Sequence, residues 1–186
     1  MGGMQPTSAH TPLQSALIAA NIRWLRQALR LLERLDDSVY SDTAPGFAPH
    51  RVGAHLRHVL EFYQCFLDGL DSSHIDYDSR RRDESIERSR HTASLAIRSI
   101  IYALDTSAEQ ERIVWVRMED AEASGVRESF MESSLSRELQ ALSSHTVHHF
   151  ALIAMTLRAH GVQMDPDFGM APSTLRHLAS KTAEAA

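Results

Sequence analysis

Four long stretches of this chain repeat their apolar residues at the three- and four-residue spacing of an α-helix. They span residues 12–35, 50–70, 84–104 and 132–160. The second shows the pattern most clearly, with Val52, Leu56, Val59, Tyr63, Phe66 and Leu70 along one face. A helix with one apolar face is stable in water only when that face is buried against other elements. The pattern therefore predicts an all-α fold, an antiparallel four-helix bundle with long connections.

The segments outside these stretches predict how the rest of the chain is organised. Residues 112–118 (RIVWVRM) are β-branched and aromatic, and residues 124–130 follow a polar turn, which favours a small hairpin between the third and fourth helices. Residues 1–11 are expected to be a disordered lead-in, and 12–160 to form the bundle. Residues 161–186, which contain two prolines and a short helical stretch, are expected to be a tail that packs on the bundle.

The start of the fourth helix has two interpretations. Ser133 or Ser134 is a suitable N-cap, whereas Ser129 with Glu132 spells a capping box that would begin the helix earlier. Gly161 is expected to end this helix, because glycine is the preferred residue just after a helix C-terminus.

Charge and composition exclude several classes of partner. The chain of 186 residues has a net charge of −5, and its one basic cluster, Arg80–Arg82, lies among acidic residues, which favours a solvated ion-pair patch over a nucleic-acid site. No apolar run approaches the ~20 residues of a membrane helix, so no membrane contact is expected. The lone cysteine, Cys65, lies in an apolar context and is expected to be a buried free thiol in a cytoplasmic protein.

Histidines are the unusual residues of this chain, and three of its eleven lie in HTVHHFALI, residues 145–153. His145 and His149 are four apart, so on a helix they point in nearly the same direction, on or beside the apolar stripe. Two inward imidazoles would repel each other if both were protonated. A divalent cation removes this problem, because it accepts a lone pair from each neutral ring.

The second helix offers the third ligand. His55 and His58 are one turn apart in HLRHVLEF, and either could complete a three-histidine site with open positions, as in catalytic metal sites. Glu61 is either an acceptor that orients one of these imidazoles or a solvated charge, and we favour the solvated charge. His148 lies on the flank and is expected to support or pack beside the site. The remaining histidines are expected at the surface: His10, His50, His74, His91, His160 and His177.

These segments resemble the DinB-like superfamily of metalloenzymes. HLRHVLEFYQCFL is similar to the family's second-helix ligand segment, and HTVHHFALI to its last-helix segment, which often reads HxxHHRGQL. The resemblance covers about residues 12–160. It implies that His58, His145 and His149 bind a divalent cation such as zinc, nickel or iron, with His55 as the competitor of His58. The family's Arg and Gln after the last histidine are replaced here, whereas the ligand positions are kept.

The resemblance also implies a function, since characterised relatives include transferases and isomerases that use low-molecular-weight thiols. We therefore expect a metal-dependent enzyme with a small-molecule substrate, acting by thiol transfer or metal-assisted hydrolysis. Arg80–Arg82 and the tail would hold the carboxylates of such a thiol. Two alternatives stay open: a non-catalytic metal-binding bundle in stress-linked binding or assembly, and a metal-free core whose histidines only form hydrogen bonds. A homodimer is expected, because bundles with long apolar faces often dimerise.

Overall fold

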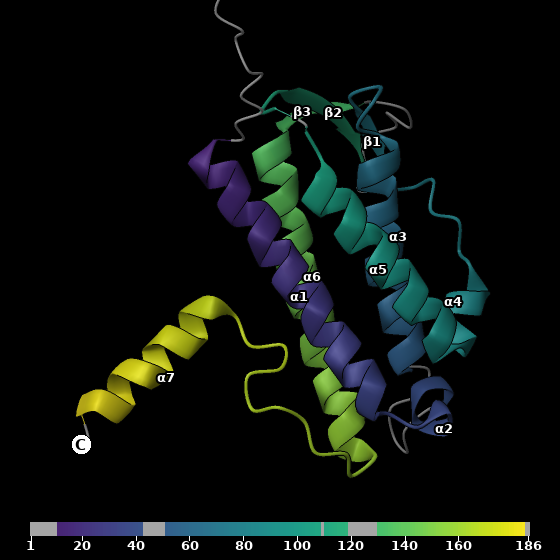
Figure 1. Ribbon diagram of the computed structural model, residues 1–186, viewed down its shortest axis with the longest axis vertical. Coiled ribbons are helices and arrows are strands. Elements are labelled where there is room, and N and C mark those ends of the chain that lie inside the picture. Colours follow the sequence, from purple (N-terminus) through teal and green to yellow (C-terminus); the bar gives the residue numbers. More distant parts are fainter. Residues whose placement is uncertain (1–10, 43–50, 109, 119–129, 185–186) are drawn as a thin grey trace, which may run out of the picture.

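The computed structural model describes residues 11–42, 51–108, 110–118 and 130–184, and these are mostly helical (Figure 1). Seven helices lie in the described residues. The long ones are α1 (Pro12–Arg34), α3 (Val52–Asp68), α5 (Arg90–Thr106) and α6 (Leu135–Ala159), and the others are α2 (Asp37–Ser41), α4 (Glu84–Arg88) and α7 (Pro172–Glu184). None of these helices is both long enough and apolar enough to cross a membrane.

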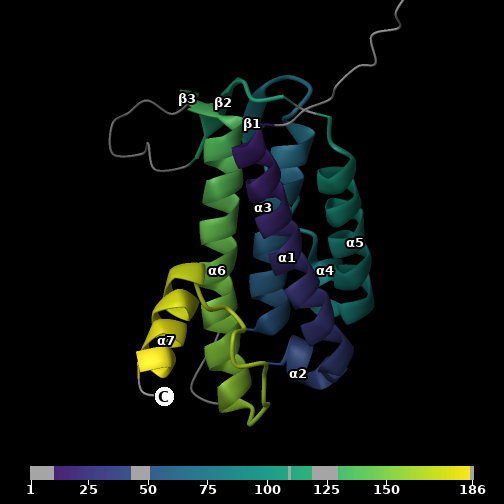
Figure 2. The ribbon, with the colours of Figure 1, turned by 60° about the vertical axis from the view of Figure 1, so that its left-hand side comes forward.

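The long helices pack through the apolar faces that the periodicity indicated. α1 and α3 each contact both α5 and α6 (Figures 1 and 2). Every predicted member of the apolar stripe from Val52 to Leu70 is buried, and Leu70 lies just beyond the end of α3. A polar network also crosses this interior: the Tyr63 hydroxyl donates to Asn21 Oδ1 on α1 at 2.7 Å and lies 3.1 Å from Thr146 Oγ1 on α6. These contacts tie α3, which carries two of the candidate histidines, to its neighbours.

The third predicted helix is divided into two. The backbone of Ser89 is extended, with φ −134° and ψ 113°, and its side chain accepts a hydrogen bond from the backbone N–H of Thr92. Ser89 thus ends α4 and caps α5, which a helical period alone does not reveal because the apolar spacing continues across the break. Leu95, an apolar residue of this stretch, is 56% exposed.

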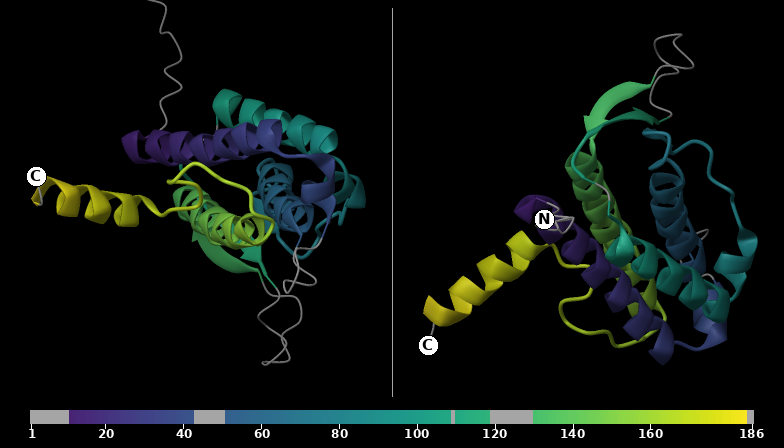
Figure 3. Two further views of the ribbon diagram at one scale, coloured as in Figure 1. Left: turned by 90° about the horizontal axis from the view of Figure 1, so that it is seen from below. Right: turned by 45° about the horizontal axis from the view of Figure 1, so that its top comes forward.

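A three-stranded sheet lies at the end of the long helices where α3 ends and α6 begins (Figure 3). Its strands, in spatial order, are β1 (His74–Asp76), β2 (Ile113–Arg117) and β3 (Met131–Ser134); β1 is parallel to β2, and β3 is antiparallel to it. β2 confirms the first strand of the predicted hairpin, with Val114 and Val116 buried. The second predicted strand, 124–130, lies outside the described residues except for its last member.

β3 and β1 correct two further expectations. Residues 131–134 pair with β2, so α6 begins at Leu135 rather than 132, and Ser134 caps it by accepting from the backbone N–H of Arg137. The prediction that Ser129 and Glu132 form a capping box at the start of this helix is wrong, because Glu132 lies in β3. β1 falls in a stretch that we expected to be an irregular polar connection. Its pairing partner lies some 40 residues later in sequence (His74 opposite Trp115), a distance that local patterns do not report.

The segment after α6 has two parts. Gly161, with φ +72°, follows α6 as expected, and residues 162–170 return along α1 and α6. Phe168 stacks on Phe150 with ring centroids 5.0 Å apart, and Gly169 N–H donates to Gln27 Oε1 at 3.4 Å. We expected the whole tail to pack on the bundle, but α7 extends away from the other helices (Figure 1).

Candidate metal centre

Four histidines meet where α3 packs against α6. His58 Nε2 lies 3.1 Å from His145 Nε2, and His55 Nδ1 lies 3.1 Å from His149 Nδ1. The ring centroids of His58 and His149 are 4.6 Å apart. One ring nitrogen from each of His58, His145 and His149 can be chosen so that all three lie within 4.8 Å of one another, and all three residues are half-buried. The structure thus brings together the three residues named from the resemblance.

The spacing of these nitrogens fits a shared cation. Two imidazole nitrogens bound to one zinc ion at about 2.0–2.1 Å in a tetrahedral arrangement lie about 3.3 Å apart. The 3.1 Å between the Nε2 atoms of His58 and His145 is close to that value. Three neutral nitrogens are also the donor set that zinc, nickel and iron accept in proteins. The residues present therefore fit a divalent cation.

The surroundings of the rings keep them neutral, which is the form that binds metals. Burial lowers the pKa of His58 and His145 to about 4 and that of His149 to about 3. Nearby positive charge adds to the effect of burial: Arg80 acts on His58 and His145, and the histidines act on one another. At neutral pH each ring consequently has one nitrogen with a free lone pair.

Acidification is expected to destabilise the metal-free protein between about pH 6.5 and 5. In the unfolded chain the imidazoles take up protons near their ordinary pKa of about 6.5, whereas in the folded protein His145 stays neutral until the pH approaches about 4. The unfolded state binds more protons in this window, so the free energy of unfolding falls as the pH falls. Most carboxyl groups titrate below it.

Urea unfolding of the metal-free protein at about pH 7, 6 and 5 measures this dependence. His145→Gln is expected to make the free energy of unfolding less dependent on pH, and His177→Gln, at an exposed histidine of α7, to leave the dependence unchanged. An identical pH dependence in His145→Gln and the wild type would show that His145 does not contribute.

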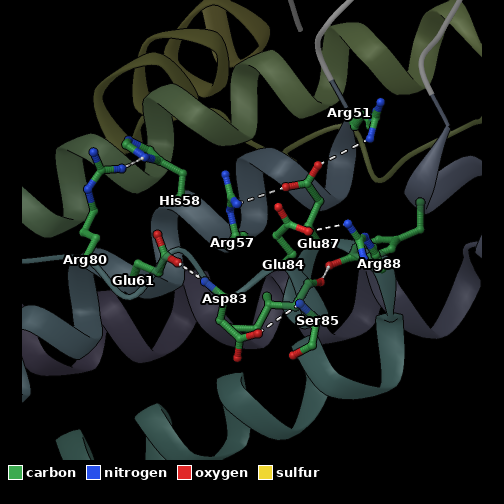
Figure 4. A network of polar contacts seen from close by, with 12 residues as sticks. Arg51, Arg57, His58, Glu61, Arg80, Asp83, Glu84, Ser85, Glu87 and Arg88 are labelled. Carbon is green, nitrogen blue, oxygen red and sulfur yellow. Dashed lines mark hydrogen bonds and ion pairs between the residues drawn. The ribbon is translucent and has the colours of Figure 1, made fainter.

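The other candidate residues take different positions. His55 is buried against His149 and lies outside the group formed by His58, His145 and His149. His148 is exposed on the flank of α6, with its ring 5.2 Å from that of His149. Glu61 is buried, so our preference for a solvated charge is wrong. Its Oε1 accepts from the backbone N–H of Asp83 at 2.8 Å, which anchors the segment before α4 (Figure 4).

The histidines expected at the surface lie mostly there. His74, His91 and His177 are exposed, and His160 is half-buried, which differs from the expectation because it ends α6 beside the returning chain. His10 and His50 lie outside the described residues.

Two further residues complete the site: Phe62, which no motif indicated, and Arg80, which was expected only as one member of the Arg80–Arg82 cluster. Phe62 stacks on His145 with ring centroids 4.2 Å apart, and Arg80 Nη1 lies 2.7 Å from His58 Nδ1 (Figure 4). The position of Phe62, four residues after His58 on one helix, was a usable signal. No local signal separates Arg80 from its neighbours. Within the described part of the chain, Arg81 is the member of the cluster that forms the predicted kind of ion pair, with Nη2 2.7 Å from Asp68 Oδ2.

A shallow surface cleft opens beside His145. Its volume is about 630 Å³, and it is lined by Arg137, Gln140, Ala141, Ser144, His145 and His148. Cys65, in contrast, is buried, and burial together with nearby carboxylates raises the pKa of its thiol to about 11. The thiol stays protonated at neutral pH and is a poor nucleophile.

Comparison with known proteins finds a partial match. A 108-residue part of this chain, 56% of its length, is 32% identical to FK506-binding protein 5 of Rhizopus delemar. The match covers 27% of that protein, so the chain spans about a quarter of the length of this relative. No family model and no solved structure matches the chain.

Proposed function

We propose that this chain is a divalent-metal-dependent enzyme of the DinB-like type. In this proposal α1, α3, α5 and α6 are the four helices of its bundle, and His58, His145 and His149 hold the cation. The observation that carries the proposal is the meeting of three neutral imidazoles from α3 and α6, with His58 and His145 separated by 87 residues in sequence. Residues this far apart in sequence meet only through the packing of α3 against α6. Binding of one shared cation is a physical reason for the three imidazoles to meet there.

The reaction class that fits best is thiol transfer or hydrolysis on a small molecule. When bound, a divalent cation acts as a Lewis acid and lowers the pKa of a thiol or water molecule that it holds. His58, His145 and His149 would hold the cation through their ring nitrogens. Phe62, stacked between His145 and Tyr77, keeps water from one side of the rings. The cleft lined by Arg137 and His148 gives a small substrate a route to His145.

The residues also restrict where the nucleophile comes from. Cys65 is the chain's one cysteine, and it is buried with a raised pKa. A thiol reaction at this site therefore uses a thiol brought by the substrate. This separates the proposal from a cysteine enzyme, whose activity would be lost with Cys65→Ser.

The test is metal content and thermal stability, followed by turnover. We expect about one zinc, nickel or iron per chain by elemental analysis. Because a ligand at a hundred times its Kd stabilises by about 2.7 kcal/mol, the melting temperature should rise by about 5–10 °C. Metal-loaded protein is then incubated with low-molecular-weight thiols and candidate electrophiles.

The outcomes separate the three interpretations of the histidines. Thiol binding or consumption supports the enzyme. A raised melting temperature with no thiol binding supports the non-catalytic metal-binding bundle. If the protein contains no bound metal, and if zinc, nickel and iron do not raise its melting temperature, the third interpretation is supported. In that interpretation the histidines belong to a metal-free core and only form hydrogen bonds with one another.

A further inference from the structure

Arg80 is placed beside the metal site in a way that an ion-pair patch does not explain. Its Nη1 lies 2.7 Å from His58 Nδ1, and its guanidinium carbon lies 5.4 Å from the centroid of the Phe62 ring. Its Nε is buried and has no hydrogen-bond partner within the described ranges. Across those same residues Arg80 forms no ion pair with a carboxylate, whereas Arg81 beside it pairs with Asp68.

The contact with Arg80 determines where the protons lie on two histidines. A guanidinium has only donors, so His58 Nδ1 must accept, and the proton of the neutral ring is then on Nε2. That Nε2–H donates to His145 Nε2, which lies 3.1 Å away. His145 consequently carries its own proton on Nδ1, an atom that is buried and has no hydrogen-bond partner among the described residues.

This arrangement of protons opposes a cation bound by the Nε2 atoms. A metal takes a lone pair, so His58 must lose its proton from Nε2 and gain one from solvent on Nδ1, which leaves the ring neutral. The new Nδ1–H then faces the N–H groups of Arg80, and two donors at hydrogen-bond distance repel each other. Arg80 must therefore leave His58 when the cation binds.

We propose that Arg80 is an exchangeable anion-binding residue of the metal site. In the metal-free protein it holds His58 in the tautomer that cannot bind a cation through Nε2. When the cation binds, Arg80 is released and binds a carboxylate of the small molecule that the cation holds. This inference rests on the proposed function and narrows it, since it names a carboxylate-bearing ligand and assigns its recognition to Arg80 rather than to Arg81 or Arg82.

The local structure favours this role for Arg80. Phe62 provides an aromatic face on which the guanidinium keeps a favourable contact while it exchanges partners. The chain around it is anchored, because Glu61 holds the backbone of Asp83 and Arg81 is paired with Asp68. A guanidinium that lacks a carboxylate partner and lies beside a metal site is suited to a carboxylate ligand, which it binds through two parallel hydrogen bonds.

The experiment compares Arg80→Met with Arg81→Met, which removes the same charge one residue away. The first measurement is ¹⁵N NMR of the histidines in the metal-free proteins. In the wild type and in Arg81→Met we expect His58 to carry its proton on Nε2, and in Arg80→Met we expect a mixture of tautomers. The second is calorimetric titration with zinc, in which Arg80→Met should bind about tenfold more tightly because a charged hydrogen bond no longer competes.

The third measurement is acetate binding to the zinc-loaded proteins. We expect the affinity for acetate to fall about tenfold in Arg80→Met, because one charge-assisted contact is lost, and to stay unchanged in Arg81→Met. Two results would overturn the role of Arg80 without contradicting the metal site. One is equal zinc and acetate affinities in Arg80→Met and Arg81→Met. The other is a wild-type His58 that carries its proton on Nδ1. If the wild-type protein binds no zinc, both the proposed function and this inference are wrong.

Discussion

Replacing His149 with alanine is expected to abolish stoichiometric metal binding. Changes to residues that merely support metal ligands cost ten- to a hundredfold in affinity, so the loss of one of three ligands should cost at least about a hundredfold. His149 is suited to this test because its ring lies within 5 Å of both His58 and His145, with centroids at 4.6 and 4.5 Å. Elemental analysis of purified protein, followed by zinc titration, measures the effect.

His148→Ala is the matched control for this variant. It removes an imidazole from the neighbouring position of the same helix, but His148 is exposed and lies outside the group of three. We expect it to keep about one ion per chain. Circular dichroism of both variants verifies that α6 is still folded. Full metal content in His149→Ala, or equal losses in the two variants, would contradict the assignment of ligands.

Replacing Phe150 with alanine is expected to lower the free energy of unfolding by about 3–5 kcal/mol, the usual cost of truncating a buried aromatic residue. Phe150 follows His149 directly, but its side chain is fully buried and stacks on Phe168 of the segment after α6. The substitution leaves a cavity and removes the ring that holds this segment. Urea unfolding of the metal-free proteins measures the loss.

The metal site should survive this second substitution. Folded Phe150→Ala protein is expected to bind about one ion per chain, because its histidines are unchanged. Phe150→Leu, which fills more of the space, should lose less stability and also keep the metal. A loss below about 1 kcal/mol in Phe150→Ala would show that the contact with Phe168 contributes little, since such a value is typical of surface positions. Neighbouring residues of one helix thus have separable roles.

The helices were largely predictable because their signal is local. A period of three and four residues places Val52, Leu56 and Val59 on one side of α3 whatever the partner helix is, and all three are buried. The same geometry placed His145 and His149 on one side of α6. The failures have two causes. The strands β1 and β3 depend on pairing between residues distant in sequence. The break at Ser89 depends on a single cap within a continuing apolar pattern.

In the candidate site, too, local features were predictable from the sequence, whereas contacts between distant residues were not. Helix geometry left either His55 or His58 as the third ligand because both lie on the same turn, and only the resemblance favoured His58. The structure places His58 beside His145 and His55 beside His149. The contacts of Glu61 and Arg80 were not predicted: we favoured a solvated charge for Glu61, and we placed Arg80 in a solvated cluster with Arg81 and Arg82. A carboxylate one turn from His58 and an arginine in a charged run both look solvated until the segment before α4 is folded back over α3.

The sequence by itself determined the helical class, the apolar faces and the direction in which each histidine pair points on its own helix. Only the tertiary structure decided which ring nitrogens meet and that Arg80 contacts His58. The physical reason is the range of the two kinds of information. Side-chain direction on a helix follows from a few backbone angles, whereas the rotation and axial position of α3 against α6 follow from the packing of the whole core.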